Sequence, residues 1–137
     1  MTWVILLLLA GDLASVKSEA NLERRSERAL VNAYAAMDTA RDAYRAGEVQ
    51  KATEALNEVR ESVDLSYESL VDTGKDPRRH PKFFKAAELK TRDLLRRLVD
   101  MRNAVMMEDR DLVDKVRAGV SEIHDNLLNG ILTKKKK

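Results

Sequence analysis

The chain of 137 residues lacks cysteine altogether. This absence excludes disulfides, thiolate metal sites, covalent c-type haem, lipoprotein acylation and a cysteine nucleophile. Residues that interrupt helices are also scarce, with two prolines and five glycines, and aromatic residues make up only 4%. A chain with so few breakers and so many Ala, Leu, Glu, Lys and Arg favours long helices over a β-sandwich.

Patterns that support catalysis or metal binding are missing as well. The chain has two histidines, His80 and His124, and no Gly-rich phosphate loop, Gly-x-Ser-x-Gly elbow or Glu-x-x-His pair. Glu122 and His124 are two residues apart, a spacing at which side chains on a helix diverge. The sequence therefore predicts a protein that is not an enzyme, with no metal site and no cofactor.

The longest apolar run lies at the very start of the chain, at residues 3–10. A helix that spans a bilayer needs about 20 residues, so this run predicts no transmembrane span. Its length is that of the apolar region of a signal peptide, and Ser18-Glu19-Ala20 matches a small-x-small cleavage site. No Lys or Arg precedes the run, and a buried N-terminal helical turn is the alternative. We expect a signal peptide at residues 1–20 and a periplasmic or secreted mature chain.

Four later stretches repeat apolar residues at the 3–4 spacing of a helix that is buried on one side. Charged residues flank each apolar stripe, which indicates that the opposite faces meet solvent. The stretches run from Leu22 to Tyr44, from Val49 to Leu70, from Phe84 to Val105 and from Val113 to Leu127.

The breaks between these stretches fall where helices need to end. Gly47 suits the positive φ of a helix C-terminus, and Pro81 suits the first turn of the third helix. Acidic residues at 108–111 are expected to cap the start of the fourth helix, and Gly130 is expected to end it. The pattern predicts one hairpin at 21–72, a linker at 72–81, a second hairpin at 82–131 and a basic tail at 134–137.

Two hairpins of nearly equal length predict an all-α fold. The expected architecture is an antiparallel four-helix bundle made of two long helical hairpins, which occupies residues 21–133. The alternative is an extended pair of hairpins that completes its core as a homodimer.

Charge is divided unevenly along the chain. Residues 1–74 carry 8 Lys and Arg against 13 Asp and Glu, and residues 75–137 carry 17 against 10, so the two parts have net charges of −5 and +7. Two interpretations are open. An acidic hairpin docks on a basic one, or the surplus positive charge meets an anionic partner.

The densest basic stretch begins in the linker and continues into the third helix. It predicts a binding site for an anionic or protein partner, because arginine grips phosphates and carboxylates with two hydrogen bonds. A solvated helix face is the alternative. Nucleic acid is not the expected partner, since no nucleic-acid motif matches and the net charge is only +2. The candidate residues are Arg78, Arg79, Lys82, Lys85 and Arg92.

Two segments of the first hairpin are similar to known families. Residues 43–52 resemble the turn inside a tetratricopeptide repeat. The longer stretch from Gly47 to Leu70 resembles the last helix of the soluble periplasmic cytochrome b four-helix bundles. This resemblance implies an exported bundle that holds haem between a methionine and a histidine, and Tyr67 stands where that family has its axial histidine. The remaining candidate ligands are Met37, Met101, Met106, Met107 and His124.

Three functions follow as hypotheses. The favoured one is a non-enzymatic exported bundle that binds a partner or serves as an accessory factor of the cell envelope. The second is a haem or metal carrier of the four-helix-bundle type. The third is a sensor or regulatory domain that acts by rearranging its hairpins or by dimerising.

Overall fold

The computed structural model describes residues 13–133, which form helices joined by turns and contain no strand. The long helices are α2 (Leu22–Arg45), α3 (Val49–Asp72), α4 (Pro81–Ala104) and α5 (Arg110–Leu132), and a short 3₁₀ helix, η1 (Met107–Asp109), precedes α5. The prediction of an all-α chain with four long helices that pack together is confirmed. Most of the predicted leader, residues 1–12, and the predicted basic tail, residues 134–137, lie outside the described residues. No helix in the described range is long and apolar enough to cross a membrane.

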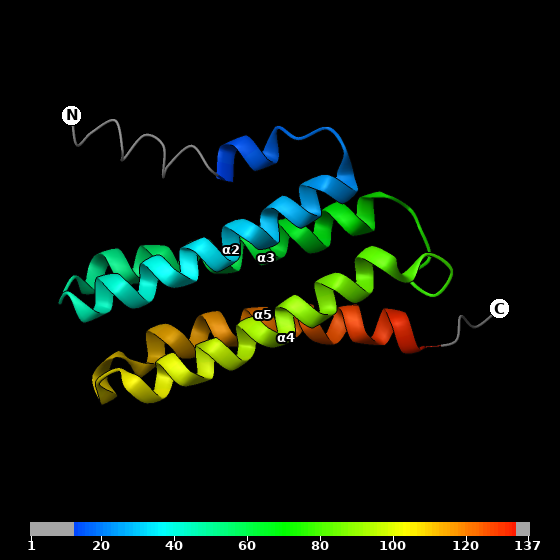
Figure 1. Cartoon of the computed structure of the whole chain (residues 1–137). Helices are drawn as coiled ribbons and strands as arrows, with labels where there is room; N and C mark the ends of the chain where they lie inside the picture. The colour runs from blue at the N-terminus through cyan, green and yellow to red at the C-terminus, as the bar shows by residue number, and fades with distance from the viewer. Residues whose placement is uncertain (1–12, 134–137) are drawn as a thin grey trace.

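The helices are stacked as two hairpins, α2–α3 and α4–α5 (Figure 1). Both hairpin turns lie at one end of the molecule, here called the turn end. The linker at residues 73–80 and the C-terminal end of α5 lie at the other, here called the linker end. The most extensive contact is between α2 and α3, and across the hairpins α3 packs mainly on α5 and α2 on α4. The consecutive helices α3 and α4 touch less than any of these pairs.

The chain reverses direction after α2 through a glycine turn. Gly47 has a φ of 80°, and the amide of Glu48 donates to the carbonyl of Ala43 at 2.9 Å. The amide of Gly47 donates to the carbonyl of Tyr44 at 3.0 Å. These two bonds satisfy carbonyls that the end of a helix leaves open, and the left-handed conformation that they need favours glycine.

Two expected helix ends differ from the structure. Gly130 does not end the fourth helix, since α5 continues to Leu132. A Cβ at Gly130 would lie 3.2 Å from Cγ of Pro77, so the glycine allows the linker to approach closely. Asp109 occupies the N-cap of α5 without a capping hydrogen bond. Its carboxylate instead accepts from the hydroxyl of Tyr44 at 2.8 Å, because a tertiary contact has replaced the local one.

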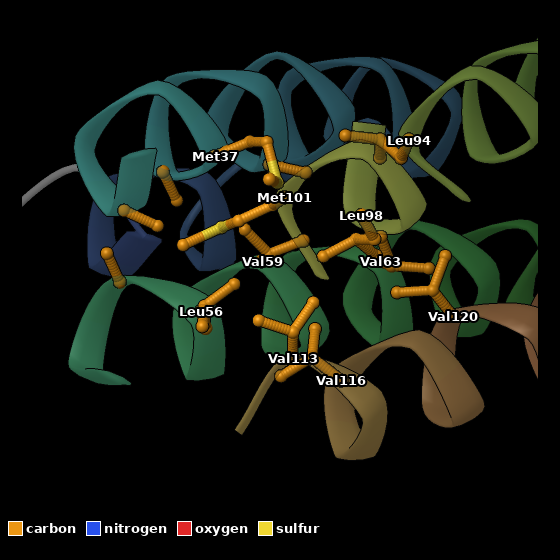
Figure 2. Close-up of a cluster of buried hydrophobic side chains, with 14 of the residues drawn as sticks. Met37, Leu56, Val59, Val63, Leu94, Leu98, Met101, Val113, Val116 and Val120 are labelled. Carbon is orange, nitrogen blue, oxygen red and sulfur yellow. The ribbon is translucent and has the colours of Figure 1, made fainter. Parts of the chain in front are cut away.

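The main core draws on all four helices. Figure 2 shows labelled side chains that converge from α2 (Met37), α3 (Val59), α4 (Leu98) and α5 (Val120). A second and smaller cluster lies toward the linker end. Its buried members are Leu30, Leu70, Phe84, Ala87 and Leu127. Since both clusters combine residues from both hairpins, neither hairpin encloses its own apolar stripe.

Small polar side chains line part of the contact between α2 and α3. The hydroxyls of Ser26 and Ser66 are 2.8 Å apart, and the amide nitrogen of Asn32 donates to Ser62 Oγ at 2.9 Å. These residues are buried, and their hydrogen bonds offset the cost of removing polar groups from water. Short side chains also let the two helices approach closely.

Tyrosines of α2, and not ion pairs, link the two hairpins through polar contacts. Within residues 13–133, no ion pair joins α2 or α3 to α4 or α5. The hydroxyl of Tyr34 donates to Asp93 Oδ2 at 2.8 Å, and the hydroxyl of Tyr44 accepts from the amide of Met106 at 2.8 Å. Between the acidic and the basic part of the chain, the ion pair in the described range is the one that joins Lys75 of the linker to Glu23 of α2 at 3.0 Å. The four long helices themselves are not held in register across the hairpins by ion pairs.

Residues 13–20, the last part of the predicted leader, lie against α2. Residues 13–17 are helical, and Leu13 and Val16 are buried. Arg28 of α2 forms an ion pair with Glu19 at 3.3 Å and donates to Ser15 Oγ at 3.1 Å. Cleavage after Ala20 would remove these contacts from the mature chain.

Replacing Leu98 by alanine tests the main core. Leu98 is fully buried, whereas Leu89 on the same helix is 57% exposed. We expect Leu98→Ala to lower the free energy of unfolding by about 2–5 kcal/mol, because truncation leaves a cavity. Leu89→Ala is the matched control and should change it by less than about 0.5 kcal/mol. Urea unfolding followed by circular dichroism measures both, and equal losses would contradict the packing of α4.

Candidate functional site

The five predicted site residues lie on the surface at and beyond the linker. Arg78 and Arg79 belong to the linker, Lys82 and Lys85 to the first turns of α4, and Arg92 to its middle. All five are exposed. The spacing of the three residues on α4 places them on one face of that helix.

The structure divides these cations into two groups. Arg92 is paired within the protein, since its guanidinium donates to both carboxylate oxygens of Glu88 at 2.7 and 2.9 Å. Basic residues further along α4 are paired too, Arg96 and Arg97 with Asp93 and Arg102 with Asp114. The positive charge of this part of α4 is therefore matched by neighbouring carboxylates.

Arg78, Arg79, Lys82 and Lys85 form the second group, here called the basic surface. Among residues 13–133, no carboxylate oxygen lies within 4 Å of their charged nitrogens. The ammonium of Lys82 lies 5.2 Å from the centre of the Phe83 ring, and this uncharged ring does not neutralise it. The basic surface therefore presents positive charge outward.

Backbone hydrogen bonds hold the linker that carries these arginines. The carboxylate of Asp76 accepts from the amide of Arg78 at 3.0 Å. The backbone carbonyl of Asp76 accepts from the amides of Arg79 and His80 at 3.1 and 2.9 Å. Asp76 is the acid closest in sequence to the arginines, yet its carboxylate caps the backbone turn. The linker thus displays the two arginines without neutralising them.

The first turn of α4 has charges that oppose its helix dipole. His80 at the N-cap makes no side-chain capping bond, and the first turn contains no acidic residue. Lys82 and Lys85 instead lie at the end of the helix that already carries partial positive charge. For Lys82, which lies in the first turn, this placement costs about 0.3–1 kcal/mol at an exposed site, and the effect falls off beyond that turn. A bound anion would relieve this repulsion.

A shallow cleft of about 270 Å³ opens at the same end of the molecule. The phenol of Tyr67 comes from α3, Pro77 from the linker, Phe84 from α4 and Asn126 from α5. The other lining residues are Val71, Gly74, Lys75 and Gly130. The sequence contains no signal for this cleft, because its walls meet only when the hairpins stack.

Glu88 is a buried charged residue that the sequence prediction missed. Its side chain is only 8% exposed, and Oε2 lies 2.7 Å from Nε2 of His124 on α5. Burial raises the pKa of Glu88, but hydrogen bonds from Arg92 and His124 outweigh burial and hold that pKa below its usual value. Glu88 lies at the helical spacing of the buried stripe, four residues after Phe84. That position is the signal that could have identified it.

Tyr34 and Asp93 form a second shared site between the hairpins. Burial and the neighbouring Asp93 carboxylate raise the pKa of Tyr34 to about 12. Hydrogen bonds from Tyr34 and Arg97 lower the pKa of Asp93. The guanidinium of Arg97 also lies 5.0 Å from the centre of the Tyr34 ring. These contacts give Asp93 and Arg97 a structural role between α2 and α4.

The structure places the candidate ligands implied by the cytochrome resemblance in different parts of the fold. Met37 and Met101 belong to the main core, whereas Met106 and Met107 are exposed at the turn end. Nε2 of His124 is engaged by Glu88. Among the described residues, no group of three or more His, Cys, Asp or Glu side chains is placed to hold a metal ion.

Comparison of the chain with models of known protein families, with curated proteins and with solved structures found no match.

Replacing Glu88 by glutamine tests the buried pairs. The folded pKa of Glu88 is lower than its unfolded value, so the carboxylate stabilises the fold above the unfolded pKa. That stability is lost as the pH falls through the folded pKa. We expect Glu88→Gln to be about 1–3 kcal/mol less stable at pH 7 and to approach the wild type in acid.

Urea unfolding at a series of pH values measures this difference. Asp100→Asn on the exposed face of α4 is the matched control, and its effect should be small throughout. A constant difference between Glu88→Gln and the wild type at all pH values would contradict the assignment.

Proposed function

We propose that the protein is a non-enzymatic, exported helical protein that binds an anionic partner as an accessory factor of the cell envelope. The observation that carries this proposal is the contrast along one helix. From Arg92 to Arg102, every basic residue of α4 is paired with a carboxylate within the fold. The basic surface from Arg78 to Lys85 has no such partner among residues 13–133.

The arrangement of the hairpins supports a functional role for this charge. Attraction between an acidic and a basic hairpin was the competing explanation for the uneven charge. No ion pair in the described range joins the four long helices across the interface between the hairpins, which supports a role for the basic surface outside the fold. Clustered cations of one sign also steer an anionic partner toward the site and raise its rate of association.

The four helices are proposed to form an antiparallel bundle. Each hairpin reverses direction through a short turn, and the linker reverses it again between α3 and α4 (Figure 1). The packing of α3 on α5 and of α2 on α4 implies a linker that crosses the end of the bundle diagonally. This crossing brings the linker beside the end of α5, where the basic surface begins.

Export is proposed from the apolar run at residues 3–10. The leader was expected to end at Ala20, and residues 13–20 contact α2 through Leu13, Val16 and Glu19. Processing after Ala20 would therefore remove this contact with α2 and leave an N-terminus near Asn21. The haem-carrier hypothesis is less well supported, since Nε2 of His124 is already engaged by Glu88.

Charge reversal tests the basic surface. We expect the variant Arg78→Glu, Arg79→Glu, Lys82→Glu to bind heparin, a soluble polyanion, at least about tenfold more weakly than the wild type in low salt. The reason is that three attractive charges become repulsive. Isothermal titration calorimetry measures the affinities directly.

The matched control reverses three exposed cations at and near the turn end, Arg45, Lys51 and Lys115. It changes the net charge by the same amount and should retain most of the heparin affinity. Equal losses in the two variants would show that only net charge matters, and that result would remove the basic surface from the proposal.

The mass of the protein in envelope and cytoplasmic fractions of its own host tests export. We expect an envelope or secreted protein whose N-terminus lies near Asn21. A mass that retains residues 13–20 in the envelope would instead fit a leader that is kept or cut earlier, in keeping with the buried Val16. A full-length protein confined to the cytoplasm would contradict export.

A further inference from the structure

One face of α3 carries acidic residues at helical spacing around a leucine. Counted from Leu65, these acids stand seven and four residues before it and three and seven residues after it. Positions at these offsets follow one line along a helix. Leu65 itself is half-buried. The line, here called the acidic stripe, consists of Glu58, Glu61, Leu65, Glu68 and Asp72.

The outer face of α4 carries basic residues at the same offsets. Counted from Leu89, they also stand seven and four residues before it and three and seven residues after it. All of them are exposed, and Leu89 itself is 57% exposed. This line, here called the basic stripe, consists of Lys82, Lys85, Leu89, Arg92 and Arg96. Two helix faces of one chain therefore match in spacing and oppose each other in charge.

The middle of the acidic stripe keeps its negative charge. Glu61 and Glu68 are exposed, and among residues 13–133 no positively charged nitrogen lies within 4 Å of either carboxylate. Burial raises the pKa of Asp64, which lies between them in the sequence, and nearby carboxylates raise it further despite Arg60. The acids of this face therefore repel one another, and a cationic partner would relieve that repulsion.

The two ends of the acidic stripe have partners on α2. Glu58 accepts a hydrogen bond from the side-chain amide of Asn32 at 3.1 Å. The carboxylate of Asp72 lies 3.8 Å from the guanidinium of Arg25, and the Asp72 side chain is 62% exposed. The two glutamates nearest to the central leucine are thus the acids that a partner would meet without competition.

The cations of the basic stripe remain able to bind. Lys82 and Lys85 have no carboxylate partner in the described range. Arg92 and Arg96 are paired on their own helix, yet their side chains are 60% and 73% exposed. A guanidinium has five N–H donors, and Glu88 accepts from two nitrogens of Arg92. The arginines can therefore hold a second carboxylate beside the first.

The two stripes do not meet within one molecule. α3 and α4 belong to different hairpins (Figure 1), and the hairpins stack through buried residues such as Val63 and Leu98, which lie off the stripes. No ion pair in the described range joins α3 to α4. Each stripe is therefore open to a second molecule.

We propose that the acidic stripe of one copy docks on the basic stripe of a second copy, so that the chains associate head to tail. A second copy is the occupant because one chain carries both faces, with the same spacing and opposite charge. Leu65 and Leu89 lie at the centre of this contact, and the charges flank them and select the partner. This inference goes beyond the proposed function, since it assigns a role to acids of α3 that an anionic partner does not contact.

The geometry sets the strength and the stoichiometry of this association. From Glu58 to Asp72 the stripe is about 21 Å long at 1.5 Å per residue. So short a contact between exposed charges is weak and sensitive to salt. The two surfaces differ, so the copies at the ends of an assembly each keep one free stripe, and association continues beyond a dimer.

Sedimentation equilibrium of the full chain tests the proposal. We expect the average mass to rise with concentration past that of a dimer in low salt and to return to the monomer in concentrated salt, because salt screens the charges. A monomer at every concentration in low salt, or an association that concentrated salt leaves unchanged, would overturn the inference.

Two variants separate the faces. Glu61→Lys with Glu68→Lys reverses the acidic stripe, and Lys82→Glu with Lys85→Glu reverses the basic stripe. Each variant alone should associate at least about tenfold more weakly than the wild type, since like charges then face each other. An equimolar mixture of the two variants retains one intact pair of stripes and should form a complex of one copy of each and nothing larger. A mixture that stays monomeric would contradict the pairing.

Matched controls reverse equal charge away from the stripes. Glu108→Lys with Asp111→Lys is the control for the acidic stripe, and Arg45→Glu with Lys51→Glu is the control for the basic one; all four residues are exposed. Both controls should associate as the wild type does. A control that loses association as fully as its stripe variant would show that net charge alone matters, and circular dichroism verifies that every variant is folded.

Heparin binding distinguishes this inference from the proposed function. The variant Glu61→Lys, Glu68→Lys leaves the basic surface intact, so it should lose self-association and keep its heparin affinity. If the wild type binds heparin through the basic surface but stays monomeric in low salt, the self-association is overturned and the proposed function stands. If the chain neither associates nor binds heparin, both fail.

Discussion

The structure depends on an apolar core that neither hairpin encloses alone. Each long helix has one narrow apolar stripe, and the stripes of α3 and α5 meet through Val63 and Val120 while Leu98 enters from α4 (Figure 2). Full burial of such a side chain contributes about 1.5–3 kcal/mol. This requirement stacks the hairpins, and the stacking in turn fixes where the linker and the end of α5 lie.

Because apolar packing holds the hairpins together, most charges are left to act locally. On α4, some carboxylates lie at or beside the buried face and engage the arginines that follow them, as Glu88 engages Arg92 and Asp93 engages Arg97. The same arrangement fails at the start of the helix, where Asp76 caps the linker backbone and the first turn has no acid. The division between paired and unpaired cations on α4 thus follows from where its acids stand.

The linker end combines the features that a partner would use. Its arginines are displayed on a hydrogen-bonded turn, and the dipole of α4 adds to their positive field. Residues from α3, α4 and α5 surround a shallow cleft beside them. The fold therefore places the basic surface and this cleft at the same end of the molecule.

The sequence by itself determined the all-helical class and the number of long helices, because apolar spacing, Gly47 and Pro81 are local signals. It also identified the basic residues from Arg78 to Arg92 as a group. Only the tertiary structure decided that Arg92 is paired with Glu88, that α5 continues past Gly130, and that Asp109 bonds Tyr44 rather than its own helix. Those outcomes depend on contacts between helices distant in the sequence, which local periodicity does not encode.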